Sequence, residues 1–347
     1  MSQPTNRPTG TSVLKAFRGP IQSYRTELAL GVACAGILIL FSVASPAFLS
    51  SANLVNLAAT LAVPGLAALA EGIVIIHGGI DLSVGAVAAL SGVITGVLVD
   101  NDMLPIWPAT GVALVAGTAV GLVNGLIVTR LRINAFITTL ASFSYVRGLA
   151  FILTGGQTNQ LTDEGFRFVG RGLVGGIPVT LVIMLGFYAF AAFMLLHTPF
   201  GRALYWVGGS PTAAALAGVP VGRVRVAAYT LGAFLASIAG ILLAAQLGAS
   251  FPKAASGLEL TAIAAAVLGG AALAGGRGSV LGTLLGVTIL RIVDNGLILA
   301  NVSSYFQDVA RGILLLGALS VDVIRQRSIQ WLRRSMGDRT TLGAQIR

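Results

Sequence analysis

Long apolar segments recur along almost the whole sequence, and no other feature constrains the fold as strongly. Each is about 20 residues long, the length of a helix that crosses the hydrocarbon core of a bilayer, and clearly longer than a strand of a membrane β-barrel. Of the 347 residues, 55% are hydrophobic and only 10% are charged, whereas a soluble domain carries about 25% charged residues. The sequence therefore predicts an all-α integral membrane protein.

Ten membrane-spanning helices are predicted from these segments. They cover residues 28–45, 54–76, 82–99, 106–128, 134–153, 177–197, 226–247, 258–275, 279–299 and 305–324. The eighth is the weakest, because glycine pairs interrupt it, and a broken or re-entrant helix is the alternative there. The 45 glycines exceed the average of about 7%, as expected where small residues let helices approach closely in lipid.

The distribution of charge predicts how the chain is oriented. The net charge is +10, and the basic residues cluster between apolar segments and at both termini, as the positive-inside rule requires. We therefore expect a basic cytoplasmic N-terminal tail (1–27), a transmembrane domain (28–324) and a basic cytoplasmic C-terminal tail (325–347). Because this pattern accounts for the excess charge, membrane lipid and not nucleic acid is the expected partner.

Motifs for catalysis are absent from the sequence. Cys34 is the only cysteine and there are two histidines, so neither a disulfide framework nor a metal site is predicted. No G-x-x-x-x-G-K-[ST] loop, G-x-S-x-G or H-E-x-x-H occurs, so we expect no enzymatic activity and no cofactor. Any use of ATP would have to come from a separate chain.

The stretch EGIVIIHGGIDLSVG (71–85) places two acids and a histidine within an apolar run. Gly78-Gly79 should break the helix, because glycine is about 1 kcal/mol less favourable than alanine in a helix interior. Asp81 could simply cap the helix that follows. The functional alternative is that the broken helix borders a polar cavity, where irregular backbone is tolerated at membrane depth.

Polar side chains inside apolar segments are costly and usually face a pathway or a partner. Arg291 and Asp294 lie three residues apart on one helix, so they could neutralise each other. The residues that we predict to line a translocation pathway are Glu71, Asp81, Ser83, Asn124 and Asn295.

The longest connection on the predicted cytoplasmic side, residues 198–225, contains the signals of a short capped helix. Ser210 can act as N-cap, Pro211 suits the first turn, and Gly218 with Pro220 ends the helix after TAAALA. We interpret this helix as a docking element for another protein; an ordinary connector is the alternative.

The sequence also contains a faint internal echo. GGIDLSVG (78–85) and GGAALAGG (269–276) match at four positions, which would fit the internal duplication common in transporters. Chance matching in a glycine-rich chain is the alternative.

Several stretches together resemble the ribose-type permease family of bacterial ABC monosaccharide importers (ribose, xylose, arabinose and galactoside permeases). They are GGIDLSVGAVAALSGV, LGGAALAGGRGSVLGTLLG, NGL followed by VSSYFQ, and FGRALYWVGGSPTAAALAGV. The resemblance runs from about residue 28 to 324. It implies a multi-pass permease subunit of the bacterial inner membrane that translocates a ribose-like pentose, a hexose or a polyol.

The resemblance also implies partners. They would be a cytoplasmic ABC ATPase with two nucleotide-binding cassettes, a periplasmic sugar-binding protein, and a second permease subunit, in a homodimer or a heterodimer. The ATPase contact would be Ser210, Pro211, Thr212, Ala213, Ala214, Ala215, Leu216, Ala217 and Gly218. An acidic residue is expected in this loop of the family, and its absence here leaves the identity of the ATPase open.

Two other functions remain open at this point. An ion-coupled secondary sugar transporter could use Glu71, Asp81 and Asp294 to bind protons or Na⁺. A membrane scaffold without transport activity is the other.

Overall fold

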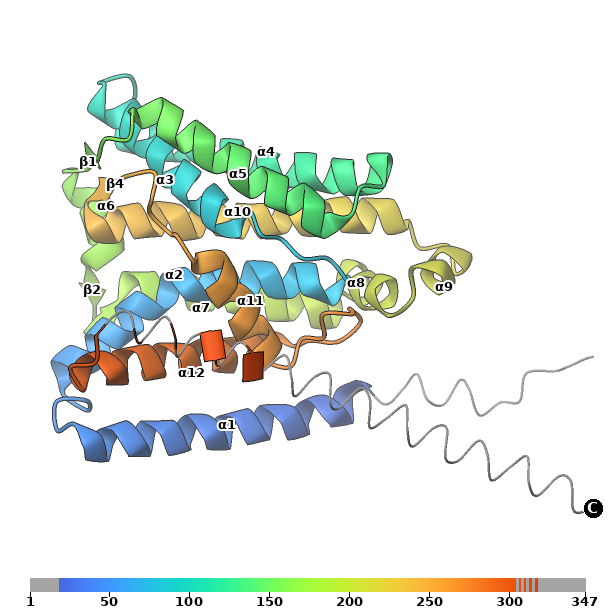
Figure 1. The fold of residues 1–347 in the computed structure, drawn as a ribbon, viewed down its shortest axis with the longest axis horizontal. Coiled ribbons are helices and arrows are strands. Elements are labelled where there is room, and N and C mark those ends of the chain that lie inside the picture. Colours follow the sequence, from blue (N-terminus) through green and yellow to red (C-terminus); the bar gives the residue numbers. More distant parts are fainter. Residues whose placement is uncertain (1–18, 304–305, 307–308, 310–311, 314–315, 318–347) are drawn as a thin grey trace, which may run out of the picture.

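The computed structural model describes residues 19–303, 306, 309, 312–313 and 316–317. In this part of the chain, seven helices are long and apolar enough to cross a membrane, and they lie roughly alongside one another in a bundle (Figure 1). They belong to α1 (Gly19–Ala44), α2 (Ser51–Ile76), α4 (Ile106–Leu126) with the π-helix η2 (Ile127–Leu131), α5 (Ala135–Thr154), α7 (Val179–His197), α10 (Val221–Leu247) and α12 (Val280–Leu299).

Shorter elements complete the described fold. Two more helices are apolar but shorter, α3 (Val84–Asp100) and α11 (Leu258–Leu268). Outside the long helices lie α6 (Glu164–Arg171), α8 (Pro199–Gly209) and α9 (Pro211–Leu216). Two antiparallel strand pairs are formed by β1 (Asn159–Gln160) with β4 (Ala249–Ser250) and by β2 (Leu173–Val174) with β3 (Ile177–Pro178). The prediction of an all-α multi-pass membrane protein is confirmed.

Most of the predicted spans agree with the helices, with two exceptions. The eighth span, 258–275, is wrong as a complete crossing, because α11 ends at Leu268. Its 11 residues rise about 16 Å, half of a hydrocarbon core of about 30 Å, so the alternative of a broken helix holds. The tenth predicted span, 305–324, falls largely outside the described residues, as do most of the two predicted tails.

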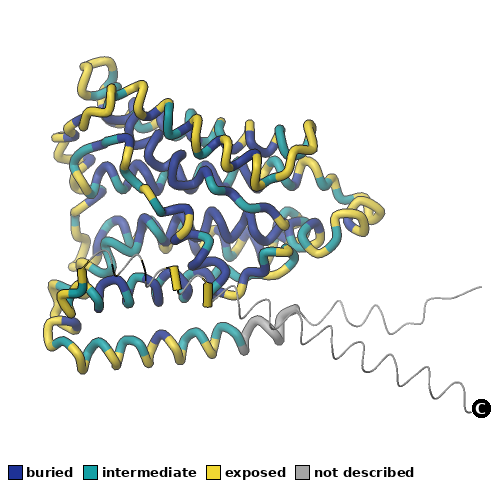
Figure 2. The backbone as a smooth tube through the Cα atoms, in the orientation of Figure 1, coloured by how far each residue is buried: buried dark blue, intermediate teal, exposed yellow. Residues whose placement is uncertain are grey.

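The buried centre of the bundle is α2. It contacts α7, α10, α11 and α12, while α10 also packs against α3 and α4. Figure 2 shows these central helices buried along most of their length, whereas α1 is largely exposed along one side of the bundle. Because lipid replaces water around such a bundle, the apolar exposed face of α1 is compatible with a bilayer.

Close backbone contact holds the centre together. A Cβ placed on Gly240 of α10 would lie 2.6 Å from the Cα of Ala88 in α3 and closer still to its carbonyl group. Only a residue without a side chain fits there, as expected for helices that pack in lipid through small residues.

The two ends of the bundle differ. Helices α8 and α9 protrude at one end, where α2 also stops, while α6 and the strand pairs cover the opposite end (Figure 1). We refer to them below as the α8–α9 end and the α6 end.

Candidate functional site

The helix break at Gly78-Gly79 is a compact, hydrogen-bonded turn. The N–H groups of Gly78 and Gly79 donate to the carbonyl oxygens of Ile75 (2.9 Å) and Val74 (3.0 Å), which satisfies the last carbonyls of α2. Gly78 has a φ of +86°, a conformation that glycine adopts at little cost. The predicted break is therefore confirmed.

The start of the next helix differs from the prediction. Helix α3 begins at Val84, within two residues of the predicted start, but Ser83 and not Asp81 occupies the N-cap position, so the capping interpretation of Asp81 is wrong. Asp81 instead holds the turn before the helix: its Oδ1 accepts the Ser83 N–H (2.8 Å) and the Ser83 hydroxyl (2.5 Å). A side chain that bonds to the backbone two residues ahead is a common turn device.

Four of the five predicted pathway residues form one buried network. The Asp81 N–H donates to Oε1 of Glu71 (3.2 Å), and the Asn124 amide donates to the Ser83 hydroxyl (3.1 Å). The hydroxyl of Ser142 donates to the Asn124 carbonyl oxygen. These five side chains are at most 1% exposed. The network therefore ties α2 and the break to α4 and α5.

Sequence reasoning missed Ser142, because a single serine within an apolar helix is common and carries no distinguishing pattern. It also missed Tyr229 of α10, whose ring lies edge-on to His77, with centroids 5.2 Å apart. Buried atoms of Glu71, His77, Asp81 and Tyr229 have no hydrogen-bond partner among the described residues. Unpaired buried polar groups usually cost about 1–3 kcal/mol each. The region around the break therefore has hydrogen-bond donors and acceptors that are unused in this conformation.

Asn295 lies apart from this network. Its side-chain amide exchanges two hydrogen bonds of 2.9 Å with that of Asn53, at the start of α2. One turn away on α12, Arg291 and Asp294 form the predicted ion pair, with a distance of 3.3 Å between Nη1 and Oδ2. Both pairs lie toward the α6 end. In the part of the chain that the structure describes, no group of three His, Cys, Asp or Glu side chains could hold a metal ion.

The predicted short helix is present as α9, and a second helix precedes it. The Ser210 hydroxyl accepts the Ala213 N–H (3.2 Å) at the N-terminus of α9, and Gly218 has a φ of +82° after its end. Helix α8 was not expected: it begins with Thr198 as N-cap and Pro199 in its first turn. Residues 221–225, assigned to the loop from sequence, belong to α10.

Three segments meet in backbone contact where α8 ends. The Gly276 N–H donates to the carbonyl oxygen of Ile76, the last residue of α2 (2.8 Å). A Cβ on Gly208 of α8 would meet both Ile76 O and Gly276 N, and a Cβ on Gly275 would lie 2.8 Å from the Cα of Gly78. We call Gly78, Gly208, Gly275 and Gly276 the glycine junction.

The glycine junction joins α8, the break after α2 and the loop between α11 and α12. It also brings together the two echoing sequences, because Gly78 belongs to one and Gly275 and Gly276 belong to the other.

Tyr205 of α8 reinforces this contact from the side. Its hydroxyl donates to the carbonyl oxygen of Gly278 (2.9 Å). Burial, with the nearby Glu27 as a smaller cause, raises the pKa of Tyr205 to about 12. The hydroxyl therefore stays protonated, and remains a donor, at any physiological pH.

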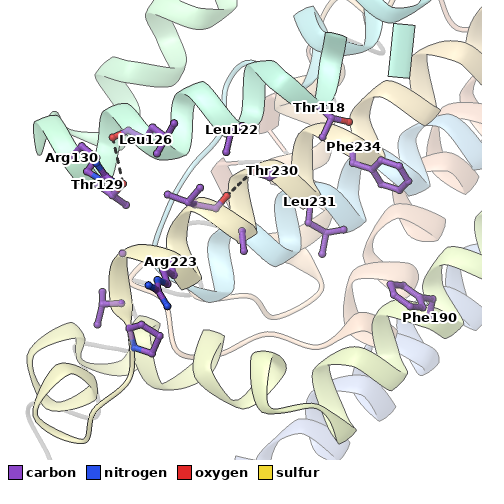
Figure 3. A pocket seen from close by; sticks show the side chains of 15 residues that line it. Thr118, Leu122, Leu126, Thr129, Arg130, Phe190, Arg223, Thr230, Leu231 and Phe234 are labelled. Atoms are coloured by element: carbon purple, nitrogen blue, oxygen red, sulfur yellow. Dashed lines mark hydrogen bonds between the residues drawn. The ribbon is translucent and has the colours of Figure 1, made fainter. Parts of the chain in front are cut away.

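An apolar groove of about 1000 Å³ runs between α4, α7 and α10 (Figure 3). Phe190, Leu231 and Phe234 line it, and Arg130 and Arg223 lie toward its α8–α9 end. No described residue of its lining has a carboxylate or amide side chain, so these residues are poorly equipped to recognise a hydroxyl-rich solute. A second, more polar cavity lies toward the α6 end and is described below.

The comparison with known families decides which class of protein this is. The family described as "Branched-chain amino acid transport system / permease component" matches residues 53–319. The chain belongs to this family.

Individual relatives cover nearly the whole permease. The ribose import permease protein RbsC of Bacillus subtilis is 40% identical over 312 residues, which are 88% of this chain and 94% of that protein. RbsC of Escherichia coli is 38% identical over 296 residues, 84% of this chain and 91% of its own length. The L-arabinose transport system permease protein AraH of E. coli is 35% identical over 300 residues, 84% and 91% of the two chains. No solved structure matches the chain.

These findings confirm the resemblance read from the sequence. They place the chain among transport proteins, and they give no support to an ion-coupled secondary transporter. They do not test the roles of individual residues, so the pathway role of Glu71, Asp81, Ser83, Asn124 and Asn295 stays a prediction.

The buried network predicts a stability effect. Asn124→Ala removes one hydrogen bond from each of Ser83 and Ser142, which keep their bonds to Asp81 and to the Tyr145 hydroxyl. We therefore expect the free energy of unfolding to fall by about 0.5–1.5 kcal/mol for each bond lost. The thermal midpoint of the purified permease in detergent should fall accordingly. Asn101→Ala is the matched control, because that exposed amide bonds only to the Val97 carbonyl of its own helix. Equal midpoints for the two variants would contradict the network.

Proposed function

We propose that the chain is the membrane-spanning permease subunit of an ATP-binding-cassette importer that carries a monosaccharide across the bacterial inner membrane. A separate ATPase with two nucleotide-binding cassettes drives it, a periplasmic sugar-binding protein delivers the solute, and a second permease subunit completes the pathway. Both termini lie in the cytoplasm, as the positive-inside distribution favours. The observation that carries the proposal is that a protruding helix pair, α8–α9, makes backbone contact with the broken helix at the centre of the bundle.

The surface of α9 suits a docking role. Leu216 is 87% exposed at the end of α9, whereas Ala214 is buried at 4%. A single exposed apolar side chain is common on protein surfaces, so Leu216 supports a docking role through its position on the protruding α8–α9 end (Figure 1). We assign residues 210–218 to the ATPase contact and the α8–α9 end to the cytoplasm.

The glycine junction could carry a movement of α8, driven by the ATPase, to the centre of the bundle. Because Gly208, Ile76 and Gly276 are in backbone contact, displacement of α8 must displace the end of α2 and the loop before α12. A packed interface of this kind transmits small shifts, since close-packed atoms cannot be compressed.

The same movement would give the predicted pathway residues access to a solute. Glu71, Asp81, Ser83 and Asn124 are enclosed in this conformation, so they would border a pathway only after the break rearranges. Asn295, near the α6 end, would border it from α12.

The solute class rests on the relatives. The names of the permeases above refer to ribose and to L-arabinose, whereas the family description refers to branched-chain amino acids. Since the permeases named for sugars are 35–40% identical to this chain over most of its length, we assign a monosaccharide.

Transport is tested in proteoliposomes that contain the permease, its ATPase and its binding protein. We expect ribose or L-arabinose to accumulate only when ATP and both partners are present, because the permease itself has no nucleotide-binding loop. Leucine uptake serves as the comparison. Accumulation driven by an ion gradient without ATP, or accumulation of leucine alone, would overturn the proposal.

The docking surface is tested by Leu216→Asp. A carboxylate at this exposed apolar position should weaken the ATPase contact about tenfold, the effect of losing about 1.4 kcal/mol, and this is measured by co-purification of the ATPase. Met103→Asp is the control, since Met103 is also exposed (63%) but lies at the α6 end. Full co-purification with Leu216→Asp would place the contact elsewhere. Ala214 is less suitable, because an acid at that buried position would disturb α9 itself.

The glycine junction is tested by Gly208→Ala. The added Cβ would meet backbone atoms of Ile76 and Gly276 and force the segments apart, whereas Gly209→Ala would meet nothing within 4 Å. We expect Gly208→Ala to abolish ATP-driven uptake while the ATPase still co-purifies, and Gly209→Ala to transport normally. The amount of each variant in the membrane is measured alongside uptake. Normal uptake with Gly208→Ala would exclude this route.

A further inference from the structure

A cavity of about 740 Å³ opens toward the α6 end, between α2, α6, α10, α11 and α12. Its volume lies within the range of about 300–1,000 Å³ that is typical of small-molecule sites. It is lined by polar side chains from all five of these helices, namely Asn56, Thr60, Arg171, Gln246, Thr261, Arg291 and Asp294. We call it the α6-end cavity.

The ion pair of α12 gives this cavity charged groups, although α12 is one of the helices long and apolar enough to cross a membrane. Arg291 and Asp294 both line the cavity, and their side chains are 22% and 10% exposed. Ionisable residues in such helices are expensive unless they pair or face a water-filled space. Arg291 and Asp294 pair with each other and also face the cavity. Their presence in α12 is explained if the cavity admits water and polar solutes.

One wall, formed by α2 and α10, presents hydroxyl and amide groups that are held by hydrogen bonds. The Gln246 amide donates to the Ala59 carbonyl oxygen (2.8 Å), and the Thr60 hydroxyl donates to the Asn56 carbonyl oxygen (2.8 Å). The end of α10 is fixed in turn, because Arg171 donates to the carbonyl oxygens of Gln246 and Leu247. The wall is therefore positioned before any solute arrives.

This set of groups matches the chemistry of a sugar. Each sugar hydroxyl can donate and accept, and the cavity offers hydroxyls, amides, a carboxylate and two guanidinium groups in one space. None of the described residues that line it is aromatic, so these residues lack the stacking surface on which tight sugar binding usually draws. Weak binding is what a transit site requires, since a solute held tightly would not move on.

We propose that the α6-end cavity is the site at which a monosaccharide first enters the permease, held by hydroxyl and amide groups of α2, α10 and α11 together with the Arg291–Asp294 pair. The assignment of the solute as a monosaccharide rests on the proposed function; the location of the site rests on the cavity itself.

Protection of an introduced thiol tests the site. Cys34 is the only native cysteine and does not line the cavity, so Cys34→Ala provides a cysteine-free background. Thr60→Cys then places a thiol in the cavity, and Met103→Cys places one at the same end of the bundle but outside it. The complex of permease and ATPase is treated from the α6 side with a membrane-impermeant methanethiosulfonate reagent, with ribose or leucine present.

We expect the thiol introduced by Thr60→Cys to react, and ribose to slow its reaction several-fold while leaving the Met103→Cys thiol unaffected. In the same background, Asp294→Asn should abolish the protection, whereas Asp102→Asn, an exposed acid outside the cavity, should not. A Thr60→Cys thiol that does not react, or that ribose does not protect, would overturn the site. Protection by leucine and not by ribose would overturn the sugar assignment.

Uptake by the cysteine-free permease is measured in the same preparation to separate the two proposals. If ribose is accumulated with ATP but does not protect the thiol, the proposed function stands and the cavity assignment falls. If ribose protects the thiol but is accumulated without ATP, the cavity stands and the ATP-driven function falls.

Discussion

A backbone that leaves the helix at membrane depth must have its polar groups satisfied by protein, because lipid offers no hydrogen bonds. The break after α2 is the place where this permease meets that requirement. Gly78 and Gly79 close the end of α2 on its own carbonyls, and Asp81 bonds to the next turn through Ser83. The rest of the bundle is arranged around this enclosed turn, with α4 and α5 held to it by Asn124 and Ser142.

The same requirement explains why glycine is used so heavily around the break. With no gain from excluding water between lipid-facing helices, close van der Waals contact has to hold the bundle together. At the glycine junction, this contact is between backbones from three different segments. Such a junction resists compression, and the hydrogen bond from Gly276 to Ile76 holds the segments together, so it can transmit a displacement. These are the properties that a coupling point between an external motor and a central helix would need.

Polarity is divided between the two ends of the molecule. At the α8–α9 end, the polar groups near the break are buried and partly unpaired, while the exposed surface of α9 presents Leu216. At the α6 end, charged and amide groups line an open cavity. On the proposed pathway, a solute would pass from the open α6-end cavity to the enclosed polar groups at the break.

The sequence by itself determined the features that depend on local interactions. Helix positions follow from the length of the apolar segments, the cap of α9 from Ser210 and Pro211, and the Arg291–Asp294 pair from a spacing of three residues on one helix. Family membership was also visible in the glycine-rich motifs. Only the tertiary structure decided which distant residues meet: Asn124 with Ser142 and Ser83, Asn295 with Asn53 rather than with the other predicted residues, and Gly208 with Ile76. The reason is physical. Caps and neighbours on one helix are governed by fixed backbone geometry, whereas contacts between helices depend on rotation, depth and close approach, which are set by the packing of the entire bundle.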